Sequence, residues 1–124
     1  MSARAFARVD MEGNLLTHSP EVLGMANCVY PNEGEIVVFG AYCFKLNFTP
    51  ASVIANSIAH PNDSGKPYIF YTAGPNVSGN FTKDGNGSDI ACRAGFQDAA
   101  VICRVGTGLG LATPPGGFFV MFFD

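Results

Sequence analysis

The sequence predicts an all-β protein, a single domain over residues 1–124 that forms an antiparallel β-sandwich, jelly-roll-like, of about eight to ten strands. Three observations lead to this fold class. Hydrophobic residues make up 48% of the chain and charged residues 14%, with many Phe and Gly and no Trp, which is typical of short apolar segments between sharp turns. Several segments alternate apolar and polar residues, as half-buried strands do. No segment repeats apolar residues at helical spacing over about ten positions.

The expected strands recur every ~8–12 residues, with Gly, Pro, Asn and Asp between them. In chain order they are RAFARVD (4–10), LLTH (15–18), EIVVF (35–39), AYCFKLNF (41–48), SVIANSIA (52–59), PYIFYT (67–72), VSGNFT (77–82), DAAVICRV (98–105) and GFFVMFF (117–123). Gly40 separates two of them and permits a bend or a bulge.

Two of these strands carry the clearest information about burial. In residues 41–48, Tyr42, Phe44, Leu46 and Phe48 share one face, and Cys43, Lys45 and Asn47 share the other, so we expect a half-buried strand. The segment 118–123 is apolar on both faces, so we expect a central strand with cover on each side.

Charge and hydropathy exclude two kinds of partner. The formal net charge is −3, and the seven Lys and Arg residues are scattered, whereas a nucleic-acid surface needs a basic stripe. The longest apolar run, 118–123, is far shorter than the ~20 residues of a membrane span. The N-terminal residues also lack the apolar run of a signal peptide. We therefore expect no nucleic acid and no membrane insertion.

The segment Asp84-Gly-Asn86-Gly-Ser88-Asp89 places oxygen-bearing side chains at alternating positions, as the start of a calcium loop does. Position 6 of such a loop is Gly but here is Asp89, and position 12 is Glu but here is Gly95. Asp-Gly and Asn-Gly are also the dipeptides that supply positive φ values in type I′ hairpin turns. The sequence favours a turn over a calcium site.

Four cysteines, Cys28, Cys43, Cys92 and Cys103, allow three sets of two disulfides. One pairing joins Cys92 and Cys103 across a hairpin near residues 96–98. Four buried thiols acting as small apolar residues are the alternative, and the sequence leaves the two open because no export signal is recognised. Close C-x-x-C pairs are absent, so we expect no zinc site and no metal.

Catalytic patterns are weak. His18 and His60 adjoin no recognisable nucleophile or acid motif, and acids such as Asp10 and Glu12 indicate catalysis only if the fold brings them together. The glycine-rich segment 106–117 runs into Pro114-Pro115, which excludes the helix behind a phosphate loop, so we expect a long flexible loop. We expect no enzyme and no cofactor.

Four segments, ARVDMEGNLLTHSPEV (7–22), AYCFKLNFTPASV (41–53), GFQDAAVICRV (95–105) and GGFFVMFFD (116–124), follow one another in an order that resembles a small β-domain. The domain is of the C-terminal type found in bacterial surface and phage fibre or decoration proteins, sometimes after collagen-like repeats. The resemblance implies a non-enzymatic structural or attachment role, on a virion or at the cell surface, with capsid or tail proteins or a cell-surface receptor as partners. It also implies a Cys43–Cys92 disulfide, with Cα atoms less than about 7 Å apart.

Assembly is expected at the C-terminal strand, because a strand of apolar residues exposes one face unless something covers it. The interface residues that we expect are Phe118, Phe119, Val120, Met121, Phe122 and Phe123, with residues 106–123 at or near the contact. We expect a homo-oligomer, with a trimer favoured because fibre-type domains are commonly trimers. The alternative function is a carbohydrate-binding, lectin-like domain, in which Tyr30, Tyr42, Tyr68 or Tyr71 stacks on sugars because the chain has no Trp.

Overall fold

A computed structural model describes residues 2–63, 65–106, 108 and 110–124. The described residues form ten strands and one short 3-10 helix, with no α-helix, so the predicted all-β class is confirmed. The elements are β1 (Ala3–Val9), β2 (Leu15–His18), β3 (Val22–Tyr30), β4 (Ile36–Leu46), β5 (Ser52–Ser57), η1 (Pro61–Asp63), β6 (Tyr68–Ala73), β7 (Asn80–Lys83), β8 (Asp89–Ala91), β9 (Ala99–Val105) and β10 (Phe118–Phe123).

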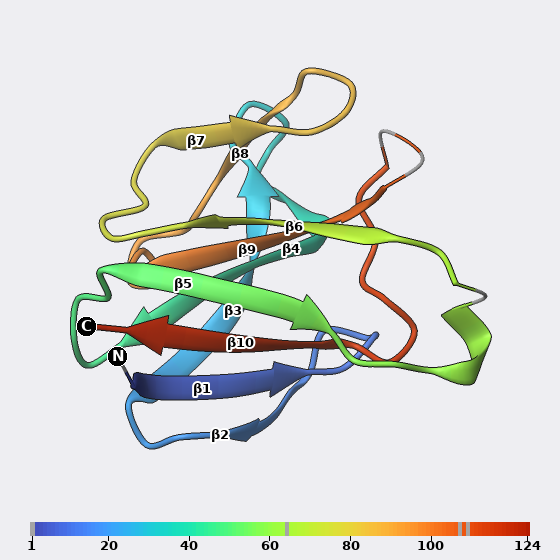
Figure 1. The fold of residues 1–124 in the computed structure, drawn as a ribbon. Helices are drawn as coiled ribbons and strands as arrows, with labels where there is room; N and C mark the ends of the chain where they lie inside the picture. The colour runs from blue at the N-terminus through green and yellow to red at the C-terminus, as the bar shows by residue number, and fades with distance from the viewer. Residues whose placement is uncertain (1, 64, 107, 109) are drawn as a thin grey trace.

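The strands form two antiparallel sheets that stack as a sandwich (Figure 1). The four-stranded sheet has the order β2-β1-β10-β5, and the six-stranded sheet has the order β6-β9-β4-β3-β8-β7. The chain crosses from one sheet to the other between β2 and β3, β4 and β5, β5 and β6, and β9 and β10. These crossings are the jelly-roll-like feature of the sandwich.

The sandwich core lies between the two sheets. The four-stranded sheet contributes alternate residues of β1 and β10, among them Val9, Phe118 and Phe122, all fully buried. The six-stranded sheet contributes Tyr42 and Phe44 from β4, and Phe44 meets Phe122 edge-on with ring centroids 5.2 Å apart. The inward direction predicted for Tyr42, Phe44 and Leu46 is therefore confirmed.

A second core lies on the other face of the six-stranded sheet, which curls so that β7 and β8 lie over it (Figure 1). This second core contains Cys28, Val38, Ala41, Cys43, Val77, Ile90, Cys92, Ala100 and Ile102. The expectation of a half-buried strand at 41–48 is wrong for its central part, because Cys43 is as fully buried as Phe44. Central strand β9 is likewise buried on both faces from Ala99 to Cys103.

Gly40 joins the two strands expected at 35–39 and 41–48 into the single strand β4. The pairing of β4 with β3 shifts between Asn27↔Tyr42 and Val29↔Val37, and the side-chain amide of Asn27 donates to the carbonyl of Val38 at 3.2 Å. At this bulge Gly40 has a φ of 82°, and a Cβ there would lie 2.8 Å from the backbone nitrogen of Ala112. The bulge therefore requires glycine.

The structure differs from the sequence analysis at one further strand and one loop. Strand β3 was not expected from its sequence, since VLGMANCVY lacks an alternating pattern, yet it pairs with both β4 and β8. The loop expected to be long and flexible at 106–117 is packed over its second half, where Pro114 is fully buried and the Thr113 hydroxyl lies 2.6 Å from that of Tyr42, whereas Gly108 and Gly110 are exposed. Residues 107 and 109 of that loop lie outside the described residues.

Strand β10 is central, as predicted, between β1 and β5. Cover on each side was also expected, and the described chain supplies it on one side only. Phe118, Val120 and Phe122 are fully buried, whereas the intervening side chains are only half-buried and face outward. The reason is the sheet order, because the four-stranded sheet has the six-stranded sheet on one side only.

Candidate functional site

The segment 84–88 forms the turn between β7 and β8, and Asp84 closes it. One carboxylate oxygen of Asp84 accepts from the backbone amides of Asn86 and Ser88, both at 2.9 Å, and Gly87 donates its amide to the Asp84 carbonyl at 3.1 Å. Within this turn only Gly87 has a positive φ, 85°, so the turn is not of type I′, which needs two such residues. A hairpin turn is present, but its type differs from the expectation.

The donors around Asp84 have an electrostatic consequence. The backbone amide of Ser88 is the main cause of a lowered pKa for the Asp84 carboxyl, and the hydroxyl of Tyr30 and the amides of Asn86 and Gly87 act in the same direction. Burial and the hydrogen bond to Asp84 raise the pKa of Tyr30 to about 12. Asp84 therefore holds the turn as a carboxylate.

Asp89, the other acid of the calcium hypothesis, is engaged elsewhere. One of its carboxylate oxygens accepts from the Lys83 ammonium at 2.7 Å, and the other accepts from the side-chain amides of Asn32 at 3.0 Å and Asn80 at 3.2 Å. A calcium site needs about 6–8 converging oxygen atoms. Here the two carboxylates serve two separate hydrogen-bond networks.

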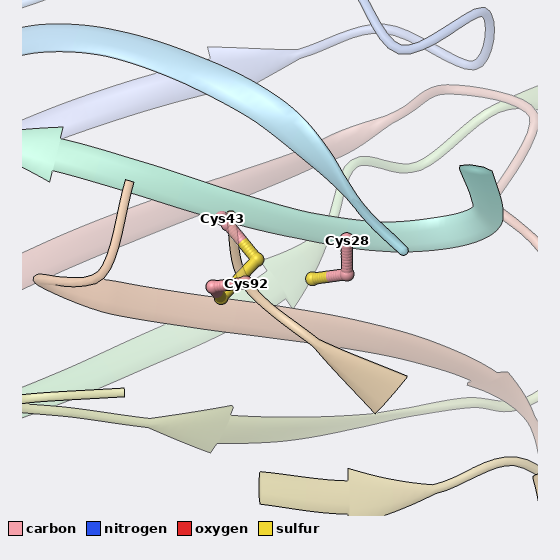
Figure 2. A group of neighbouring side chains, drawn as sticks. All are labelled: Cys28, Cys43 and Cys92. Carbon is pink, nitrogen blue, oxygen red and sulfur yellow. A yellow bond between two sulfur atoms is a disulfide. The ribbon is translucent and has the colours of Figure 1, made fainter. Parts of the chain in front are cut away.

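The cysteines gather in the second core. Cys43 on β4 and Cys92, just after β8, form a disulfide with Cα atoms 5.8 Å apart, which is the pairing that the resemblance implies (Figure 2). The thiol of Cys28 on β3 points toward this disulfide in Figure 2, and the three sulfur atoms lie within 4.8 Å of one another. In the described residues this is the only group of at least three metal-ligating side chains so close together. Two of its sulfur atoms are already bonded to each other.

The side chain of Cys103 lies on the opposite face of the six-stranded sheet from the other three cysteines. It belongs to the sandwich core, whereas Cys92 belongs to the second core, so the pairing of Cys92 with Cys103 across a hairpin is wrong. Cys28 and Cys103 are buried free thiols, and burial raises the pKa of both well above the usual value. These thiols pack as small apolar side chains.

The two histidines lie in different places. His18 is exposed on β2, and its Nδ1 lies 2.9 Å from the carbonyl of Ser19. His60 lines an open hollow of about 490 Å³ with Asp10 and Glu12, and its Nδ1 accepts from the backbone amide of Asn62 at 3.0 Å.

Asp10, the acid in the His60 hollow, is committed to a turn. Its two oxygens accept from the backbone and side-chain amides of Asn14 at 2.8 and 3.1 Å, and the backbone donor is the main cause of its lowered pKa. A general acid or base works best with a pKa near the operating pH, and this carboxyl is shifted the other way.

The outward-facing side of the four-stranded sheet is apolar at its centre. Phe119, Met121 and Phe123 of β10 face outward, and the register places Met121 between Phe6 of β1 and Ile54 of β5, which are 37% and 48% exposed. Phe6 and Phe119 stack with ring centroids 6.2 Å apart. These five side chains are called the outer face below. Of the six residues predicted for the interface, only these three of β10 face outward, because Phe118, Val120 and Phe122 face the sandwich core.

A hollow that the sequence did not indicate lies on the six-stranded sheet. It has a volume of about 270 Å³ and is lined by Ile69, Phe70, Tyr71, Thr82, Lys83, Ile102 and Arg104. Tyr71 is 50% exposed, whereas Tyr42, another tyrosine of the lectin hypothesis, is buried in the sandwich core. Only the register of β6 with β9 places Tyr71 beside Ile102 and Ile69 beside Arg104, so no local motif reveals this hollow.

Comparison with known proteins found no matching family model, no similar curated protein and no similar solved structure. The resemblance to surface and fibre domains therefore stays a prediction from the sequence. Among the described residues, no helix has the length and apolar character to cross a membrane.

Proposed function

We propose that this protein is a non-enzymatic structural or attachment module that assembles into a homo-oligomer through the outer face of the four-stranded sheet. The observation that carries the proposal is the row of Phe119, Met121 and Phe123 on a central strand, with no second layer over it in the described chain. Contiguous exposed apolar side chains on a small protein mark interaction surfaces. Here the half-buried side chains of β10 lie between the exposed Phe6 of β1 and the exposed Ile54 of β5, so the apolar face extends across three paired strands.

A second copy of the chain is the occupant that suits this face. The five side chains of the face carry no charge, and of the two arginines of β1 beside them Arg4 pairs with Asp124 at 2.8 Å, whereas Arg8 lies opposite Phe119. Two such faces can therefore meet over their uncharged centre, with Arg8 at the rim of the contact beside the hollow that it lines with Asp10 and Glu12. The guanidinium of Arg4 also lies 4.4 Å from the centre of the Phe48 ring, which fixes it at the edge of the sheet.

The resemblance of the sequence to fibre-type domains supports the further parts of the proposal. It favours a trimer, and it favours a location on a virion or at the cell surface, with capsid or tail proteins or a cell-surface receptor as further partners. A non-enzymatic role is supported by what the reactive groups do. Asp10 and Asp84 close turns, and Cys28 is buried as a protonated thiol.

Sedimentation velocity at micromolar concentrations tests the assembly. The wild-type chain of 13.1 kDa should sediment as an oligomer. Met121→Glu places a charge at the centre of the outer face without touching the core, and it should give a folded monomer. Circular dichroism and thermal melting check that this variant keeps its fold.

Phe39→Glu is the matched control, because Phe39 is 78% exposed on β4, away from the outer face. This variant should remain oligomeric. A wild-type protein that is monomeric throughout would overturn the proposal, and so would dissociation by Phe39→Glu with none by Met121→Glu.

A further inference from the structure

The hollow lined by Ile69, Tyr71 and Arg104, here called the Tyr71 hollow, is built on two paired strands. In the register of β6 with β9, Ile69 lies opposite Arg104, and Tyr71 lies opposite Ile102. Directly paired residues project their side chains from the same face of a sheet, with Cβ atoms about 4.5–5.5 Å apart. Ile102 belongs to the second core, so the four side chains lie on the face that points away from the sandwich core.

The floor and the wall of the Tyr71 hollow are apolar. Ile102 is only 3% exposed and forms the floor, whereas Ile69 and Tyr71 are 56% and 50% exposed. Thr82 and Lys83 of β7 complete the lining, because the curled sheet brings β7 near β6 (Figure 1). An aromatic ring that is half in solvent beside an apolar floor offers a surface for stacking.

Two cations adjoin this apolar surface, and they differ in their partners. Lys83 is held by Asp89 at 2.7 Å, so its charge is compensated. Arg104 has no side-chain hydrogen bond or ion pair with any other described residue, and the residue opposite it on β6, Ile69, is apolar. A guanidinium presents donors in a planar fork that matches a carboxylate. Arg104 is therefore the group in the hollow that is ready to receive an anion.

We infer that the Tyr71 hollow binds a carboxylated pyranose, a sugar ring that carries an acid group. The Tyr71 ring stacks on the apolar C–H face of the sugar, and Arg104 donates to its carboxylate. Thr82 also lines the hollow and supplies a hydroxyl that can bond to the sugar. The volume of about 270 Å³ lies below the ~300–1,000 Å³ of pockets for larger ligands, so a single ring fits.

The half-exposed wall distinguishes a sugar from an aromatic acid. An aromatic acid has two apolar faces and gains from having both covered, whereas a pyranose keeps its hydroxyl groups in water while one face stacks. The inference does not rest on the proposed assembly, since the sandwich core and the four-stranded sheet lie between the hollow and the outer face. An oligomer would present several hollows and so increase avidity for a polymer of such sugars.

Titration of the isotopically labelled full chain by NMR tests the inference, with methyl glucuronide, methyl glucoside and benzoate as probes. Methyl glucuronide should shift the amide signals of β6, β9 and β7 around the hollow. The neutral glucoside should bind about tenfold more weakly, because it lacks the charge-assisted bonds to Arg104.

Variants separate the two contacts. Arg104→Gln should remove the preference for glucuronide over glucoside, Tyr71→Ala should weaken both sugars, and Tyr71→Phe should retain them. Arg93→Gln is the matched control, because Arg93 is an exposed arginine that contacts the carbonyl of Glu35 and does not line the hollow, and it should bind as the wild type does.

Three results would overturn the inference: glucuronide and glucoside binding equally to the wild type, glucuronide shifting signals elsewhere or none, and benzoate binding where glucuronide does not. The last of these would identify an aromatic acid as the ligand. These titrations report on binding in the hollow and not on the oligomeric state. A negative titration would therefore leave the proposed assembly intact, and a monomeric wild type would leave the proposed sugar site intact.

Discussion

Strands β4 and β10 are both central and both rich in apolar residues, yet the described chain covers both faces of the central part of β4 and only one face of β10. On β4, Phe44 faces the sandwich core and Cys43 faces the second core, and both are fully buried. On β10, Phe122 is fully buried, whereas the adjacent Phe123 is only half-buried. The difference lies in what the rest of the chain places over each sheet.

The cover over β4 comes from a distant part of the sequence. The β7–β8 hairpin and the residues around it bring Val77, Ile90 and Cys92 onto the second face of the six-stranded sheet, and the Cys43–Cys92 disulfide ties this cover to β4. No described segment is placed in this way over the outer face of the four-stranded sheet. This difference is the basis of our proposal that a second copy of the chain covers the outer face.

The largest expected effect separates the two faces of β10. Phe122→Ala removes a fully buried ring from the sandwich core and should lower the free energy of unfolding by about 3–5 kcal/mol. Phe123→Ala acts on the outward side and should cost the isolated chain far less while weakening the oligomer. Urea unfolding at concentrations below assembly, together with sedimentation, measures both quantities. Equal losses of stability in the two variants would show that both faces of β10 are buried alike.

The next effect concerns the cover over β4. The disulfide closes a sequence separation of 49 residues, so the double variant Cys43→Ala/Cys92→Ala should lose about 2–4 kcal/mol in unfolding free energy. Cys28→Ala, in the same core but outside the disulfide, is the control and should lose less. Denaturant unfolding with and without reductant measures this. A double variant as stable as the wild type would mean that packing alone holds the cover in place.

The smallest effect is on the β7–β8 turn within that cover. Because the pKa of Asp84 is lowered in the folded chain, its contribution to stability is present above the unfolded value of about 3.9 and is lost as the pH falls through the folded value. Asp84→Asn should therefore reduce the loss of stability on acidification below about pH 4. Thermal melts across this range measure it, with Glu33→Gln as an exposed acidic control. An unchanged pH profile in Asp84→Asn would contradict the role given to this carboxylate.

Part of the candidate sites could be predicted from local sequence. Asp-Gly and Asn-Gly dipeptides indicated the turn at 84–88, because a turn is specified by its own few residues. The partners of Asp89 and the position of Arg104 could not be predicted. Asn32 lies 57 residues from Asp89 in the chain. Tyr71 is on β6 and Arg104 is on β9, and only the pairing of these two strands in the sheet brings them together.

The sequence by itself determined the all-β class, most strand positions and the inward direction of Tyr42, Phe44 and Leu46, because these follow from short-range periodicity and turn residues. Only the tertiary structure decided that β3 is a central strand, that Cys43 is as fully buried as Phe44, and that the outward side of β10 is left open. The physical reason is that a strand has two faces, and its own residues show only whether each face is apolar. What covers that face depends on which distant strands the fold brings over it.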